Sequence, residues 1–113
     1  MARHLQSQGA IILGQNLKLG RYEIDILAKH HHTLIVCEVR ARSSGTLVHP
    51  AYTIDKRKLD HLCRAFHRWE QDNKDVVYSE VRFDAAAVIV NPTTFVDSQR
   101  MQIHYYENIL GFA

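Results

Sequence analysis

The sequence has 113 residues, a length that fits one domain with a single hydrophobic core. Hydrophobic residues make up 46% and charged residues 23% of it, which excludes a disordered or fibrous chain. The net charge of +2 permits a nucleic-acid partner without requiring one. Cys37 and Cys63 are isolated, so neither a zinc site nor a disulfide framework is predicted. No apolar run suits a signal sequence or a membrane span, so we expect a cytoplasmic protein.

The N-terminal half predicts a short helix followed by three strands. Residues 3–9 read as the last turns of a helix with Gly9 as its C-terminal cap, and residues 10–16 as a first strand. A polar connection at residues 18–21 leads to two apolar, β-branched segments, 22–28 and 34–40. The polar residues between them, 29–33, have the length of a hairpin loop.

The C-terminal half predicts a helix and two more strands. After a loop at residues 43–50, residues 55–73 place apolar side chains at spacings of three and four, with Thr53 or Asp55 as N-cap. These apolar residues are Leu59, Leu62, Phe66 and Trp69. Residues 81–91 predict a strand covered on both faces, residues 102–106 a last strand, and residues 109–113 an apolar tail docked on the body. The order predicts an α/β (α+β) fold, a central mixed β-sheet flanked by helices, in one domain spanning residues 1–113.

Two acidic residues lie inside the predicted hairpin strands. If residues whose numbers sum to 63 pair across the turn, Asp25 lies opposite Glu38 and Leu27 opposite Val36. Alternation then places Glu38 and Arg40 on the same face. Like charges directly opposed are unfavourable, so this pair calls for a cation, and carboxylate oxygens suit Mg²⁺ or Mn²⁺.

An alternative interpretation needs no metal. In it, one or both acids lie at a solvated sheet edge, and Arg40 neutralises Glu38 as an ordinary surface pair. The metal interpretation also depends on the register of the two strands. A slip of one residue would send Asp25 and Glu38 to opposite faces of the sheet.

Four features in order carry a resemblance to a known family. They are Glu-Ile-Asp at 23–25, Glu-Val-Arg at 38–40, Lys56 at the head of the predicted helix, and Arg-Phe-Asp at 82–84. Over nearly its whole length the chain resembles the YraN-like family of small bacterial proteins. That family typically shows Gly-Glu-Ile-Asp, Val-Glu-Val-Lys and Arg-Phe-Asp segments in this order. The resemblance implies a restriction-endonuclease-like fold, similar to that of Holliday-junction resolvases.

The resemblance implies a nuclease core of the PD-(D/E)xK kind. Asp25 and Glu38 would hold the divalent metal, Mg²⁺ or Mn²⁺, and Arg40 would occupy the position of the lysine. Arginine is always charged, so Arg40 clamps a phosphate but does not serve as a general base. Relatives often supply another glutamate from the first helix, and residues 1–16 contain none. Lys56 is the candidate for the vacant catalytic role, with a solvated first-turn lysine as the alternative.

Basic residues define the expected binding surface. The candidates for nucleic-acid binding are Arg40, Lys56, Arg57, Lys58 and Arg64. An ordinary solvated helix face is the alternative for those on the helix. We therefore weigh three functions: a metal-dependent endonuclease acting on DNA, a catalytically inactive nuclease-fold module that binds DNA, and a structural or protein-partner domain. The last would use Tyr105, Tyr106 and the apolar tail, and a homodimer is compatible with all three.

Other polar residues have more ordinary interpretations. Glu23 shares a face with Asp25, and a salt bridge to Arg21, Arg40 or Arg82 is favoured over a metal contact. Arg82 and Asp84 are predicted to form a structural ion pair in preference to a substrate site. The three consecutive histidines at 30–32 point in different directions, so a polar hairpin tip is predicted in place of a metal site.

Overall fold

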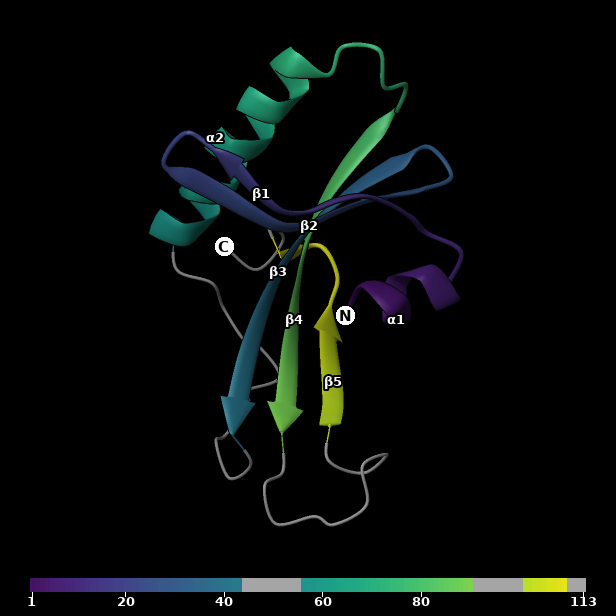
Figure 1. The fold of residues 1–113 in the computed structure, drawn as a ribbon, viewed down its shortest axis with the longest axis vertical. Helices are drawn as coiled ribbons and strands as arrows, with labels where there is room; N and C mark the ends of the chain where they lie inside the picture. Colours follow the sequence, from purple (N-terminus) through teal and green to yellow (C-terminus); the bar gives the residue numbers. More distant parts are fainter. Residues whose placement is uncertain (44–55, 91–100, 110–113) are drawn as a thin grey trace.

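The computed structural model describes residues 1–43, 56–90 and 101–109 of the chain. The elements are α1 (Ala2–Ser7), β1 (Ile11–Leu19), β2 (Tyr22–His30), β3 (Thr33–Ser43), α2 (Lys56–Asp72), β4 (Glu80–Val90) and β5 (Met101–Tyr106). The strands form one sheet in the order β1-β2-β3-β4-β5 (Figure 1). β3 and β4 pair in parallel and all other neighbours are antiparallel. The predicted α+β fold with a mixed sheet is confirmed.

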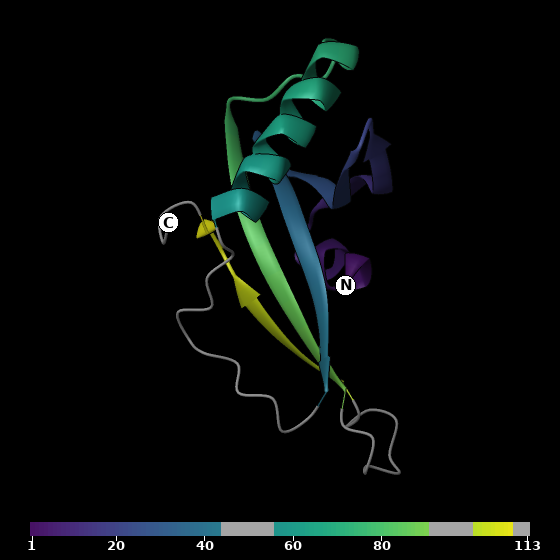
Figure 2. The same cartoon turned by 90° about the vertical axis from the view of Figure 1, so that its left-hand side faces the viewer.

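The two helices pack against opposite faces of the sheet. Alternate residues of β3 separate the two cores: Leu34 and Val36 pack with α2, whereas Ile35 and Cys37 pack with Leu5 of α1. Figures 1 and 2 show α2 running across the upper part of the sheet and α1 lying apart from it beside the N-terminus. Because β3 is covered on both faces, it reads as an almost continuous apolar run before Glu38.

The apolar stripe predicted for the long helix is its buried face. Leu59, Leu62, Phe66 and Trp69 are all buried in α2. Spacings of three and four place them on one side of the helix, where they meet the sheet. Phe66 packs edge-on against Phe83 of β4, with ring centroids 6.1 Å apart. This packing fixes which side chains of α2 border the sheet.

The connection between the first two strands is shorter than predicted. β1 continues to Leu19, and only Gly20 and Arg21 form the turn, so the predicted connection at residues 18–21 is wrong at its first two positions. Leu19 pairs with Tyr22 across this turn. Gly20 has φ +67°, a left-handed conformation that glycine adopts without steric strain and that two-residue hairpins require.

The turn between β2 and β3 also has two residues, His31 and His32. The predicted loop at 29–33 is too long, because Lys29 pairs with Leu34 and His30 with Thr33. His31 has φ +55° and both turn histidines are exposed. The histidine run therefore lies at a polar hairpin tip, as predicted.

Two aromatic residues of β5 pack within the chain. Tyr105 lies against the core under α1, and Tyr106 lies against the core under α2. Ile109, the first residue of the predicted tail, is buried with the α2 core. The rest of that tail, the loop at 44–50, the N-cap candidates Thr53 and Asp55, and residue 91 lie outside the described residues.

Of the described helices, neither α1 nor α2 has the length and apolar composition needed to cross a membrane.

Candidate functional site

The candidate site lies at a fork where β2 leaves β3. The two strands pair from His30↔Thr33 to Ile26↔Cys37, so residue numbers sum to 63 as predicted, but the pairing ends before it reaches Asp25 and Glu38. Beyond this point β2 turns aside with β1, whereas β3 continues alongside β4 (Figure 1). Asp25 and Glu38 are the first residues past the last pair. The fork therefore opens where the two acids lie.

The direction of β2 changes at Asp25. Ile24 packs in the core under α2 and Ile26 in the core under α1, although residues two apart on a regular strand share a face. Asn16 on β1 lies between the residues that pair with Ile26 and Ile24, and it has φ +51°. Asp25 Oδ2 accepts a hydrogen bond of 2.9 Å from the backbone N–H of Val39. A side chain thus satisfies a donor of β3 that the diverging strand no longer reaches.

Asp25 borders an open groove on the α1 side of the fork. The groove has a volume of about 370 Å³. Its lining comes from α1, β1, β2 and β3, namely Met1, Ala2, Gln15, Asn16, Asp25, Ile26, Val39 and Ala41. The volume falls in the range typical of ligand sites, about 300–1,000 Å³. A ligand in this groove would meet the Asp25 carboxylate beside two amide side chains.

Glu38 is a buried carboxylate with only one satisfied oxygen. Its exposed fraction is 3%. Oε1 lies 3.1 Å from Lys58 Nζ and 3.7 Å from Arg40 Nε, whereas the buried Oε2 has no hydrogen-bond partner in the part of the chain that the structure describes. The ion pair with Arg40 agrees with the predicted shared face, but a solvated edge is wrong for Glu38. An unsatisfied buried oxygen is unfavourable and calls for an explanation, and a cation at Oε2 would supply one.

The lysine that lies beside Glu38 is Lys58, and not the predicted Lys56. Lys56 is exposed and has no ion pair within the described part of the chain. Residues two apart on a helix project about 200° apart, so these two side chains leave α2 in nearly opposite directions. Lys58 lies one turn before buried Leu62, on the border of the apolar stripe. That spacing is a signal in the sequence that would have favoured Lys58 over Lys56.

The other predicted basic residues lie away from the fork. Arg57 is exposed on α2, and Arg64 forms an exposed pair with Asp60 at 2.7 Å. Glu23 forms the predicted kind of salt bridge, but with Lys18 at 2.8 Å, so the expected arginine partner is wrong. Arg40 and Lys58 therefore lie beside Glu38 on the α2 side of the fork, Asp25 borders the groove on the α1 side, and the remaining candidates lie on the surface.

The described residues at the fork do not form a metal site with several protein ligands. Within residues 1–43, 56–90 and 101–109, no three His, Cys, Asp or Glu side chains group together as a metal site. Mg²⁺ is usually bound through one or two carboxylates and keeps several waters. Asp25 and Glu38 are the two carboxylates at the fork, fewer than a closed protein cage would need.

Asp84 anchors a second, structural cluster. It is fully buried and accepts hydrogen bonds from Arg82 Nε and Nη2, at 2.9 and 2.8 Å. Tyr105 Oη donates to it at 2.5 Å and the backbone N–H of Asn108 at 2.9 Å. Both carboxylate oxygens are satisfied, and the bonds tie β4 to the end of β5. The predicted structural ion pair is therefore present.

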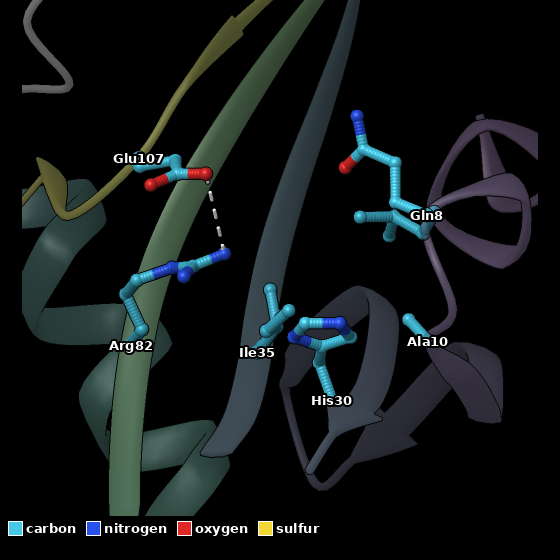
Figure 3. Close-up of a pocket in the computed structure, with 7 residues that line it drawn as sticks. Gln8, Ala10, His30, Ile35, Arg82 and Glu107 are labelled. Carbon is cyan, nitrogen blue, oxygen red and sulfur yellow. Dashed lines mark ion pairs between the residues drawn. The ribbon is translucent and has the colours of Figure 1, made fainter.

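A small cavity lies beside this cluster (Figure 3). Its volume is about 110 Å³, and Gln8, His30, Arg82 and Glu107 approach it from four parts of the chain. Arg82 Nη2 lies 3.8 Å from Glu107 Oε1, as the dashed line in Figure 3 marks. The cavity is smaller than typical ligand sites, and its arginine is already bonded to Asp84. The fork remains the better candidate.

Tyr105 predicts how stability responds to alkaline pH. Burial, the neighbouring Cys37 and the hydrogen bond to Asp84 raise the pKa of the Tyr105 hydroxyl above its ordinary value. The unfolded chain therefore releases this proton at lower pH than the folded protein, so we expect stability to fall as pH rises above about 10. Urea unfolding between pH 8 and 11.5 should show that the free energy of unfolding falls less steeply with pH in Tyr105→Phe than in the wild type. Equal slopes for both proteins would contradict this role.

Comparisons with known proteins place the chain among bacterial relatives. Residues 1–88 match the sequence model of the uncharacterised protein family UPF0102. A UPF0102 protein of Streptomyces coelicolor is 36% identical over 90 residues, which cover 79% of this chain and 69% of that protein. One of Sorangium cellulosum is 38% identical over 92 residues, covering 80% and 64%. One of Porphyromonas gingivalis is 31% identical over 106 residues, covering 94% and 74%.

Proposed function

This chain belongs to the uncharacterised protein family UPF0102, and we propose that it binds nucleic acid through a nuclease-like fold and hydrolyses phosphodiester bonds in DNA with a divalent cation. The observation that carries the proposal is the buried Glu38 carboxylate, whose Oε2 lacks a partner among the described residues, at the same fork as Asp25. Buried acids inside strands are unfavourable for folding, so their presence favours a functional role.

The two acids supply ligands of the right chemistry for Mg²⁺ or Mn²⁺. Glu38 Oε2 and the Asp25 carboxylate are hard oxygen donors, which these cations prefer. A bound cation would lower the pKa of a water molecule and neutralise charge on a phosphate. The hydrogen bond from Val39 to Oδ2 would hold the Asp25 carboxylate in place for this task.

Cationic side chains around the acids would receive the DNA backbone. Arg40 and Lys58 border Glu38, with side chains 32% and 42% exposed, and both are accessible to a phosphate at the fork. Lys56 and Arg57 are exposed on the same end of α2 and would neutralise neighbouring phosphates. Arg40 would clamp a phosphate oxygen without accepting a proton, because a guanidinium stays charged.

Calorimetric titration with Mn²⁺ and then Mg²⁺ tests this proposal. We expect saturable binding by the wild type that is lost in both Asp25→Asn and Glu38→Gln, because each variant removes one anionic ligand. Asp75→Asn, a change at an exposed acid beyond α2, is the matched control and should bind as the wild type does. Linear, single-stranded and branched DNA are then screened for cleavage. Absence of metal binding and of cleavage by the wild type would refute the hydrolytic function.

A catalytically inactive DNA-binding or partner-binding module is the second candidate. It is favoured by the two protein cations that already compensate Glu38, Lys58 at 3.1 Å and Arg40 at 3.7 Å. In that case binding of DNA would persist in EDTA and weaken as salt rises, because phosphate contacts release counterions. Fluorescence anisotropy with labelled DNA in EDTA separates this module from a domain that binds only protein.

A further inference from the structure

Lys58 approaches the buried acid more closely than the strand arginine does. Its Nζ lies 3.1 Å from Glu38 Oε1, whereas Arg40 Nε lies 3.7 Å from the same oxygen. Lys58 reaches Glu38 from the first turn of α2, and Arg40 reaches it from β3 itself. A lysine from α2 thus lies beside Glu38, although the Glu-Val-Arg motif on β3 contains no lysine.

We propose that Lys58 is a catalytic residue of this site, whose ammonium group contacts the phosphate at the bond that is cut. This inference rests on the proposed phosphodiester hydrolysis. An ammonium has three donors on a compact head, so it bonds Glu38 and a phosphate oxygen at the same time. The Lys58 side chain is 42% exposed and that of Glu38 only 4%, so the lysine presents its charge to a ligand while the acid holds it.

The reaction assigns Lys58 an electrostatic role. A water oxygen forms a bond to phosphorus, the bond from phosphorus to one sugar oxygen breaks, and the proton that the water loses is balanced by one that the leaving oxygen gains. Negative charge builds on the non-bridging oxygens during this exchange. Lys58 keeps its proton throughout and donates a hydrogen bond to one of these oxygens, where a fixed donor lowers the barrier.

A lysine that merely neutralises the DNA backbone would behave differently. Its removal weakens binding and reduces the dependence of affinity on salt by about one counterion, with no change in rate once DNA is bound. The charge of Lys58 is already compensated by Glu38 before DNA arrives. A catalytic Lys58 should in addition act on the rate at which bound DNA is cut, whatever its removal does to the salt dependence in EDTA.

Two measurements on Lys58→Met distinguish these roles. The first is the affinity for a labelled DNA in EDTA at several salt concentrations, and the second is the single-turnover cleavage rate with Mn²⁺ at saturating protein. We expect a rate at saturating protein that is lower by about 10²–10³-fold, the usual effect of losing one donor to developing charge, beyond any change in affinity or salt slope. Lys74→Met, at an exposed lysine beyond α2, should change neither quantity.

A second variant guards against a simple folding defect. Lys58→Arg keeps the charge beside Glu38, and we expect it to recover part of the lost rate, with thermal melting recorded for every variant. A reduced salt slope with an unchanged rate in Lys58→Met would overturn the role of Lys58 alone. A wild-type protein that binds DNA but cuts none of it would overturn the hydrolysis first, and the role of Lys58 with it.

Discussion

Replacing Asp84 with alanine lowers the free energy of unfolding by about 3–5 kcal/mol, the usual effect of removing one partner from a buried ion pair. Asp84 is fully buried and receives donors from Arg82, Tyr105 and the backbone of Asn108. Alanine would remove the acceptor of the charged Arg82 and of two further hydrogen-bond donors at once. Urea unfolding at pH 7 measures the difference.

The matched control for this variant is Glu107→Gln. Glu107 also lies near Arg82, at 3.8 Å, but its side chain is 65% exposed. Exposed pairs contribute about 0–1 kcal/mol, so this variant should unfold almost as the wild type does. Comparable losses in both variants would mean that Arg82, and not the buried carboxylate, dominates the cluster.

The ion pair of Glu38 and Lys58 predicts a second large effect on the free energy of unfolding, a loss in one variant and a gain in another. Lys58→Met alone should lower the free energy of unfolding by about 3 kcal/mol, because Glu38 keeps only the longer contact with Arg40. Adding Glu38→Leu should restore the wild-type value or exceed it by about 1–4 kcal/mol, since apolar replacements of buried ion pairs are often stabilising. A double-mutant cycle in urea measures both steps.

Lys56→Met, on the same turn of α2 but exposed, is the control for the helix and should change stability little. A double variant no more stable than Lys58→Met would show that Glu38 contributes to folding in its own right. The expected gain instead would mean that the chain retains Glu38 at the expense of stability. Such a trade-off is typical of functional residues.

The sequence predicted most of the sheet and the strands that carry the two acids. The register of the β2–β3 hairpin was predictable from the position of the polar turn between two apolar segments, because the turn determines which residues pair. The stripe on α2 was predictable because Leu59, Leu62 and Trp69 repeat at helical spacing.

The finer geometry of the site depended on tertiary contacts. The bend at Asp25 arises because β2 must pair with β1 while β3 stays with β4, and strand periodicity carries no trace of that divergence. The choice of Lys58 depends on how α2 docks, which places position 58 and not 56 beside Glu38. The partner of Glu23 followed from the longer β1 strand, which brings Lys18 opposite it.

The parallel pairing of β3 with β4 has a consequence for the order of folding. His30 pairs with Thr33 across a two-residue turn, whereas Thr33 pairs with Glu80 from far along the chain. Local contacts close quickly, while distant ones must first overcome the entropy of a long loop. We expect the β1–β2–β3 meander to form early and the docking of α2 and β4 to limit the rate. The strands that carry Asp25 and Glu38 would then pair first, and Lys58, which compensates the charge of Glu38, would arrive last.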